Sequence, residues 1–562
     1  MGKLIIAKLV KTNKTLVYKL VILICLFPVI SRSQEFLGTG QIHGSFQMDA
    51  QYYMEDSLIG APEVPEQVLM NAFANILYTN GDFSAGLRYE SYQNVMQGFD
   101  SRYKGNGIPY RFASYKSDEL KVTIGNFYEQ FGTGLIFRAY QNWNLGLDNS
   151  IDGINVIYTP LKGITVKGLI GNQRFFFDKG PGIIRGADGE FFLNDMIKSW
   201  AEKKVKITIG GSVVSKYQKD MDPIYKLPEN VAAFAGRTNI ACGKINFVSE
   251  YAYKINDPSA VNYYIYKPGE ALYSSATFSQ KGLGISFSAK RIDNMNFRSD
   301  RAITGNPLIL NYLPALTKEH SYSLAAMYPY STQPNGEMGM QGEIIYNIKK
   351  NTKFGGKWGT DISINYSRAN SIDRVPVNDT TAIMESGTLG YKSDFFKIGK
   401  ELYYEDFNIE ISRKISKKVI AIITYLYQSY NKEVIEWHPG APTIYSHIGI
   451  LDLSYKVKDK KSLQLELQHL YTKQDKGNWV MAMLQYTIAP KWFFSVGDMY
   501  NYGNKGKSER FHYYNASFGF IKNANRISIT YGRQREGILC VGGVCRFVPA
   551  SNGVTLTIIS SF

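Results

Sequence analysis

The sequence predicts an all-β protein, a single large antiparallel β-barrel that spans a membrane. Three observations predict it: short alternating segments follow one another from about residue 39, the last one ends on Phe562, and no apolar run after residue 33 has the length of a spanning helix. A chain can cross a bilayer without such helices if its backbone polar groups pair within a closed barrel. With roughly 10 residues for each tilted strand, we expect an even strand number between about 22 and 28, with about 26 as the best count.

The alternation has a period of two residues. Leu463, Leu465 and Leu467 point one way, and Gln464, Glu466 and Gln468 point the other. A soluble β-sandwich would show the same pattern. Its repetition along the chain without a helical domain, together with 41 Tyr concentrated near segment ends, favours a barrel whose tyrosines lie at the lipid–water boundary.

The last segment carries Val554, Leu556, Ile558, Ser560 and Phe562 on one face. An alternating strand that ends on an aromatic carboxylate resembles the C-terminal assembly signal of outer-membrane barrels. The resemblance implies Phe562 as the assembly signal and the barrel-assembly machinery as a partner. The alternative is the edge strand of a soluble sandwich.

Residues 1–33 have the features of a signal peptide. Five lysines precede an apolar run at 20–30, and Ser31 and Ser33 offer small residues for cleavage before Gln34. The run is too short for a membrane anchor, which needs about 20 residues, and Ile24 is too bulky for a lipoprotein site at Cys25. We therefore expect an exported barrel over 34–562, located in the bacterial outer membrane and in contact with its lipid.

Composition excludes two other classes of protein. Apolar residues make up 44% of the chain and the mean hydropathy is −0.21, too polar for a bundle of membrane helices. The formal net charge is +16, and removal of residues 1–33 leaves 58 basic against 48 acidic residues. These basic residues are scattered, without a basic block or an aromatic RNA-binding motif, so we expect no nucleic-acid partner.

Connection lengths alternate between short and long when they are followed back from Phe562. Short turns at 522–525, 489–491, 458–461 and 416–418 are expected on the periplasmic side, and long loops at 537–551, 501–510, 431–442 and 370–400 on the external side. The alternation fails between about 280 and 337, which indicates one crossing missed or counted in excess, within 293–318 or near 131–140. Because strand-like alternation begins at Ile42, no separate plug domain is expected.

The segment from Cys540 to Cys545 predicts a disulfide-bonded hairpin. Gly542 and Gly543 can supply the positive φ angles of a two-residue turn, which places the two cysteines opposite each other within disulfide reach. The alternative is a metal site, but no other Cys or His lies nearby in the sequence. Export to an oxidising compartment favours the disulfide.

Motifs for catalysis and cofactors are missing from the sequence. The stretch 503–508 ends in Gly-Lys-Ser but lacks the first glycine of a phosphate-binding loop, the six His are dispersed, and no Gly-x-Ser-x-Gly occurs. We expect no cofactor, no metal and no enzyme activity. A lumenal enzyme, built from residues that converge from distant strands, is the remaining alternative.

Two stretches rich in Gly, Asn and Asp, 125–153 and 180–189, depart from simple hairpins. We expect them to fold into the lumen, with charged side chains that pair there. The alternative is ordinary strand and loop. The candidate network consists of Glu129, Arg138, Asp148, Asp152, Arg185 and Asp188.

The stretches NFYEQFGTGLIFRAY, LGLDNSIDG and CVGGVCRFVPA, with the closing SF, resemble a Bacteroidota family of exported barrel proteins catalogued as a domain of unknown function. The resemblance implies fold and location but no activity. The leading functional hypothesis is therefore a pore or transport channel of unspecified solute. The alternative is a non-conducting scaffold or accessory of an envelope secretion or surface-assembly machine, with loop 370–400 as the surface for envelope protein partners.

Overall fold

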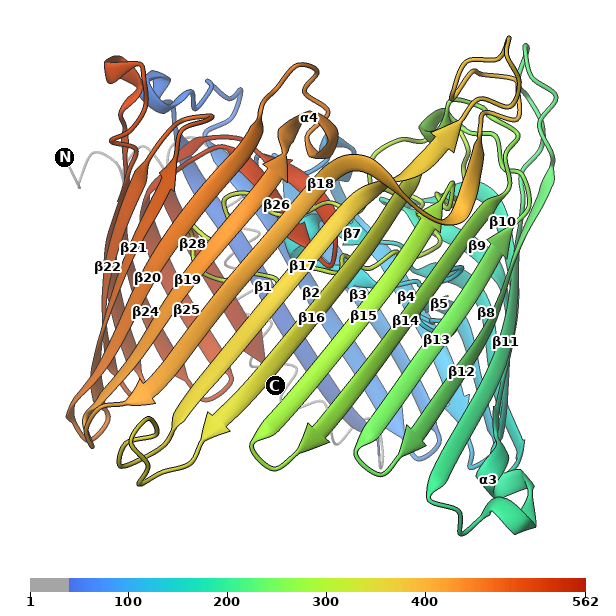
Figure 1. Ribbon diagram of the computed structural model, residues 1–562, viewed down its shortest axis with the longest axis horizontal. Coiled ribbons are helices and arrows are strands. Elements are labelled where there is room, and N and C mark those ends of the chain that lie inside the picture. Colours follow the sequence, from blue (N-terminus) through green and yellow to red (C-terminus); the bar gives the residue numbers. More distant parts are fainter. Residues whose placement is uncertain (1–39) are drawn as a thin grey trace.

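In the computed structural model, which describes residues 40–562, the chain forms one closed antiparallel barrel of 24 strands. Neighbouring strands follow the order of the sequence, and β28 pairs with β1 to close the wall, with Tyr52 opposite Val554 (Figure 1). The wall strands are β1 Gln41–Met54, β2 Val68–Asn80, β3 Phe83–Gln93, β4 Gly105–Lys116, β5 Leu120–Phe127, β8 Ile151–Leu161, β9 Ile164–Phe175, β10 Asp178–Phe192, β11 Val205–Tyr217, β12 Asn230–Cys242, β13 Ile245–Lys254, β14 Gly269–Gln280, β15 Leu283–Asp293, β16 Gly336–Ile348, β17 Thr360–Val375, β18 Lys392–Lys414, β19 Val419–Asn431, β20 Thr443–Lys458, β21 Lys461–Thr472, β22 Trp479–Ile488, β23 Trp492–Tyr500, β24 His512–Lys522, β25 Asn525–Gln534 and β28 Ser551–Ser561.

The remaining elements lie in the connections between wall strands. They are β6 Gln141–Asn142, β7 Leu147–Asp148, β26 Gly537–Val541, β27 Val544–Val548, the helices α3 Leu193–Met196 and α4 Lys432–Ile435, and the 3-10 turns Ser57–Ile59, Ser101–Tyr103, Trp143–Leu145, Lys198–Trp200, Ala260–Asn262 and Lys507–Glu509. Within residues 40–562, none of the helices is long and apolar enough to cross a membrane.

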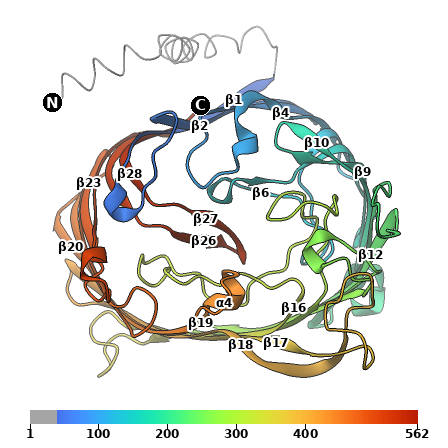
Figure 2. The same ribbon diagram turned by 90° about the horizontal axis from the view of Figure 1, so that it is seen from above.

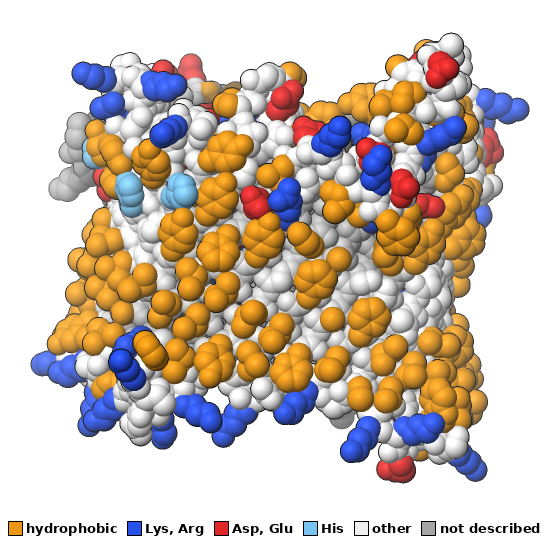
Figure 3. Space-filling model, in the orientation of Figure 1, with side chains coloured by type: hydrophobic (Ala, Val, Ile, Leu, Met, Phe, Trp, Pro, Cys, Tyr) orange, Lys and Arg blue, Asp and Glu red, His pale blue; other side chains and the backbone are white. Residues whose placement is uncertain are grey.

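The wall strands place polar side chains inside and apolar side chains outside, the opposite of a soluble sandwich. In β21, Glu466 and Gln468 are buried in the lumen, whereas Leu467 is 39% exposed on the outside. Figure 3 shows the consequence on one face of the barrel: an apolar band crosses its middle, with Lys and Arg along the lower edge. Such an outer surface is stable only in contact with lipid. The expected all-β barrel is confirmed, and its strand number lies within the expected range.

The best count of 26 strands was two too high. The stretches that broke the expected alternation, 128–150 and 294–335, contain no wall strand. For 128–150 this agrees with the expected fold into the lumen, because Phe131, Ile136 and Phe137 are buried inside the barrel at 0% exposure.

Two further expectations are wrong. Residues 180–189 do not fold inward but belong to β10, where Ile183 to Gly189 pair with both neighbouring strands. The expected loop 370–400 is about half strand, because β17 and β18 continue past irregular pairings at Asn370 and Ile372 and leave only 376–391 as a loop. This extended pair rises above the rim in Figure 1.

The connections differ on the two sides of the barrel. On the side of α3 the connections are mostly short, and on the side of α4 they include all those longer than 12 residues. We call these the short-turn side and the long-loop side. Viewed from above, several connections of the long-loop side cross the interior of the barrel (Figure 2).

Candidate functional site in the barrel lumen

Three segments fill the lumen. They are the first lumen segment (residues 128–150, with β6 and β7), the second lumen segment (residues 294–335) and the hairpin (residues 537–548, with β26 and β27). Each connects two wall strands on the long-loop side. The lumen filling described here is therefore built from loops of the barrel itself.

The first lumen segment is held to the wall by apolar packing. Phe131, Leu135, Ile136 and Phe137 are at most 2% exposed and pack in one core with residues of the wall. Burial of each such side chain contributes about 1.5–3 kcal/mol, or roughly 6–12 kcal/mol for the four. The segment is consequently a fixed part of the structure.

The second lumen segment joins both halves of the interior. Its first part binds the first lumen segment, since the backbone N–H of Arg138 donates to the Leu310 carbonyl at 2.8 Å and Asn311 Nδ2 donates to the Leu135 carbonyl at 3.1 Å. Its later part, with Leu324 and Tyr330 buried, packs against the opposite wall. This segment is also fixed by buried apolar contacts.

A buried cluster of two arginines and two carboxylates links the first lumen segment to the wall. Arg88 and Glu90 project from β3, Arg174 from β9 and Asp148 from β7. Arg174 lies 2.6 Å from Glu90 and 2.6 Å from Asp148, and Arg88 lies 2.7 Å from Glu90 and also contacts Asp148. We call this group the arginine–carboxylate cluster. Its charges balance within the barrel.

The predicted network does not form: among residues 40–562 none of its six members forms an ion pair with another, although three of them pair with other residues on the inner side of the barrel. Asp148 belongs to the arginine–carboxylate cluster, and Glu129 of the first lumen segment pairs with Lys167 of β9 at 2.8 Å. Asp188 accepts hydrogen bonds from Ser212 and Arg237 along the inner wall, at 2.6 and 2.8 Å.

The other three residues of the predicted network lie in different surroundings. Asp152 pairs with the exposed side chains of Arg111 and Lys179. Arg185 is exposed in β10 and forms no ion pair among residues 40–562. Arg138 does enter the lumen, but it stacks between the rings of Tyr140 and Tyr312, at 4.6 and 4.1 Å, where carboxylates were expected. Aromatic rings replace the anions as its partners.

The hairpin forms as its sequence predicts and contains a disulfide between Cys540 and Cys545, whose Cα atoms are 4.1 Å apart. Gly542 and Gly543 form the turn with φ angles of 58° and 83°. A Cβ on Gly542 would collide with Tyr312, so the turn needs glycine for space as well as for conformation. The hairpin, however, lies inside the lumen.

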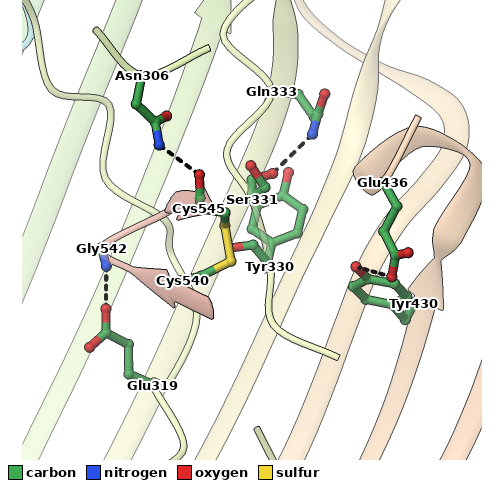
Figure 4. The surroundings of a disulfide bond; sticks show 10 residues. All are labelled: Asn306, Glu319, Tyr330, Ser331, Gln333, Tyr430, Glu436, Cys540, Gly542 and Cys545. Carbon is green, nitrogen blue, oxygen red and sulfur yellow. Dashed lines mark hydrogen bonds between the residues drawn. A yellow bond between two sulfur atoms is a disulfide. The ribbon is translucent and has the colours of Figure 1, made fainter. Parts of the chain in front are cut away.

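The hairpin contacts both lumen segments through polar groups, and Figure 4 shows its contacts with the second lumen segment. Asn306 Nδ2 donates to the Cys545 carbonyl at 2.7 Å, and the Gly542 N–H donates to Glu319. Arg546 Nε donates to the Asn144 carbonyl at 2.6 Å. No residue from 537 to 548 is fully buried. The hairpin contributes no residue to either buried apolar core, so hydrogen bonds of about 1 kcal/mol net each and half-buried side chains hold it in place.

Four cavities border the hairpin. Their volumes are about 350, 380, 120 and 150 Å³, and their linings include, in that order, Arg546, Ile538, Cys540 and Val544 of the hairpin. The hairpin therefore forms part of the lining of each of these four cavities.

Residues 40–562 include no group of three or more His, Cys, Asp or Glu side chains arranged to hold a metal ion. The arginine–carboxylate cluster was not predicted. Its only local signal is the spacing of Arg88 and Glu90, two residues apart on the inner face of one strand.

A family model described as "Family of unknown function (DUF6029)" matches residues 13–562, which agrees with the expected resemblance to a family of unknown function but does not test its bacterial group. No curated protein matches the chain. Among solved structures, a mutant of the ferric enterobactin receptor PfeA from Pseudomonas aeruginosa is 10% identical with a TM-score of 0.43, over 93% of this chain and 80% of that one.

The P pilus usher PapC translocation pore is 10% identical with a TM-score of 0.44, over 92% and 99% of the two chains. The outer membrane transporter YddB from Escherichia coli is 8% identical with a TM-score of 0.36, over 92% and 80%. At these values the similarity says nothing about what this chain binds or moves.

Proposed function

The chain belongs to the DUF6029 family, and we propose that it is a bacterial outer-membrane barrel with a transport role, closed by its hairpin in the state described. The closed wall and the apolar outer band support insertion into a bilayer. The predicted signal peptide at 1–33 and its cleavage site before Gln34 lie outside the described residues. They support export and belong to the proposal, as does a solute that is still to be named.

The arrangement around the hairpin carries this proposal. The two lumen segments are fixed by buried apolar side chains, whereas the hairpin is only partly buried and borders all four cavities. Displacement of the hairpin would widen the spaces that it now lines, without breaking either apolar core. The least costly movement of the lumen is thus the one that opens it.

A second candidate is a non-conducting scaffold of an envelope machine. The observation in its favour is the filling itself, because apolar cores occupy both halves of the lumen. In this case the extended strands β17 and β18, with Phe396 82% exposed, would contact an envelope protein partner. The absence of enzyme activity stays a prediction.

Solute flux into liposomes separates the two candidates. The wild type is compared with a variant in which residues 537–548 are replaced by a short Gly-Ser linker, and with a control variant shortened within 376–391. Transport predicts slow flux through the wild type, fast flux through the hairpin variant and no change in the control. Wild-type protein that never admits solute, beside a leaky hairpin variant, would support the scaffold. An inserted hairpin variant without flux would contradict the proposed closure by the hairpin.

A further inference from the structure

The cavity of about 350 Å³ lies beside the hairpin and combines arginines with aromatic rings. Its lining includes Arg102, Arg174 and Arg546, and also Phe99 and Phe175. Pockets for small molecules begin at about 300 Å³ and are mostly apolar with a few placed polar groups. The cavity has the size of such a pocket, and its lining combines aromatic rings with charged side chains.

Two of the three arginines are already neutralised by carboxylates. Arg174 belongs to the arginine–carboxylate cluster, in which the charges balance. Arg102 binds Asp100 with two hydrogen bonds, 3.0 Å from Nε and 2.6 Å from Nη2. Neither arginine contributes net charge to the cavity.

Arg546 is the cation that no carboxylate neutralises. Its Nε donates to the Asn144 carbonyl at 2.6 Å, and its Nη1 is buried without a hydrogen-bond partner. Its guanidinium lies over the ring of Phe99 at 4.1 Å. Among residues 40–562 no acidic side chain forms an ion pair with it. Burial lowers the pKa of Arg546 to about 10, so the side chain is still charged at neutral pH.

A partly buried, unpaired cation is unfavourable, and an anion beside it removes the cost. The neighbouring rings of Phe99, Phe175 and Phe176 would contact an apolar group attached to that anion. We propose that this cavity binds a small organic anion, an acidic headgroup on an apolar body, with Arg546 as the residue that recognises the charge. The physiological use of the site rests on the proposed transport function.

Benzoate is a suitable probe, and benzyl alcohol is its neutral counterpart. Binding of each is measured by ligand-observed NMR titration of purified protein in detergent micelles. The wild type should bind benzoate saturably and at least about tenfold more tightly than benzyl alcohol, which corresponds to about 1.4 kcal/mol. Arg546→Gln should weaken benzoate binding about tenfold, within the range of a charge-assisted hydrogen bond.

Two further variants separate a loss of charge at residue 546 from a displacement of the hairpin. Arg546→Lys loses the Asn144 contact and the flat stacking on Phe99 but keeps the charge, so it should retain most of the binding. Arg185→Gln, on the outer wall, should bind as the wild type does. Equal binding of both probes, an unchanged Arg546→Gln, or equal losses in the Gln and Lys variants would overturn the proposal. Because no flux is measured, a transport failure with intact binding would count against the proposed function alone.

Discussion

Arg174 of β9 and Asp148 of β7 form an ion pair with 2.6 Å between Nη1 and Oδ2, and this pair ties the first lumen segment to the barrel wall. Both side chains are 2% exposed. Arg174 also holds Glu90, so one guanidinium serves two buried carboxylates.

Replacement of Arg174 by Met should destabilise the folded barrel. Glu90 and Asp148 would share only Arg88, and removal of one partner from a buried ion pair costs about 3–5 kcal/mol. The temperature or urea concentration at which the detergent-solubilised barrel loses its compact electrophoretic mobility measures this loss. Arg185→Met, on the outer wall, is the matched control and should unfold as the wild type does. Equal stability of the two variants would show that the cluster does not anchor the segment.

The disulfide should be dispensable for assembly but not for closure. For a loop of this length, closure entropy gives the disulfide about 2 kcal/mol of stabilisation, all of it local to the hairpin. Mass spectrometry of non-reduced peptides should find Cys540 joined to Cys545, and the double Ser variant should insert normally but leak solute. Two free thiols in protein from the envelope, or a variant that fails to insert, would contradict this placement of the hairpin.

Phe562 should be required for efficient assembly. Its backbone exchanges two hydrogen bonds of 2.9 Å with Gly44, and its ring lies against that glycine at the seam where the wall closes. Deletion of Phe562 should reduce the amount of heat-modifiable protein in the outer-membrane fraction, whereas Phe562→Tyr should preserve it. Normal assembly of the truncated chain would contradict the prediction that Phe562 is needed for assembly.

Acid should loosen the long-loop side at Asp475. Burial raises the pKa of the Asp475 carboxyl, but the hydrogen bond and charge of Lys432 outweigh this effect and hold the pKa below its ordinary value. Asp475 also accepts a hydrogen bond from Tyr328 of the second lumen segment at 3.1 Å. Because the folded-state pKa is depressed, the contact stabilises the protein above the unfolded-state pKa of about 3.9, and this stabilisation is lost as the pH falls through the folded-state pKa.

The stability difference between the wild type and Asp475→Asn measures this contribution. It should be constant between about pH 5 and 7 and should shrink below about pH 4. A difference that changes mainly near neutral pH would assign the effect to another group.

The wall was predictable because the alternation of apolar and polar residues within each strand shows which side chains face lipid and which face the lumen. Leu467 and Gln468 are adjacent in the sequence, and the first faces lipid while the second is buried in the lumen. This alternation needs no information from distant residues. The turn of the hairpin was predictable for the same reason, since Gly542 and Gly543 specify it locally.

The lumen could not be predicted in the same way. The Gly, Asn and Asp content of 125–153 predicted that this segment enters the lumen, but not that Phe131 and Phe137 hold it there, because these side chains are as apolar as lipid-facing residues. Arg174 meets Glu90 across 84 residues of sequence, and Arg88 meets Asp148 across 60. Such contacts depend on the curvature of the closed wall, which no local pattern contains.

Single-channel recording in planar bilayers tests most directly whether the hairpin closes the lumen. Wild-type barrels should stay closed for long periods and open briefly to one conductance level, and the variant without residues 537–548 should remain at that level continuously. A variant that is fully inserted and heat-modifiable but does not conduct, or a wild type that is open throughout, would contradict closure of the lumen by the hairpin.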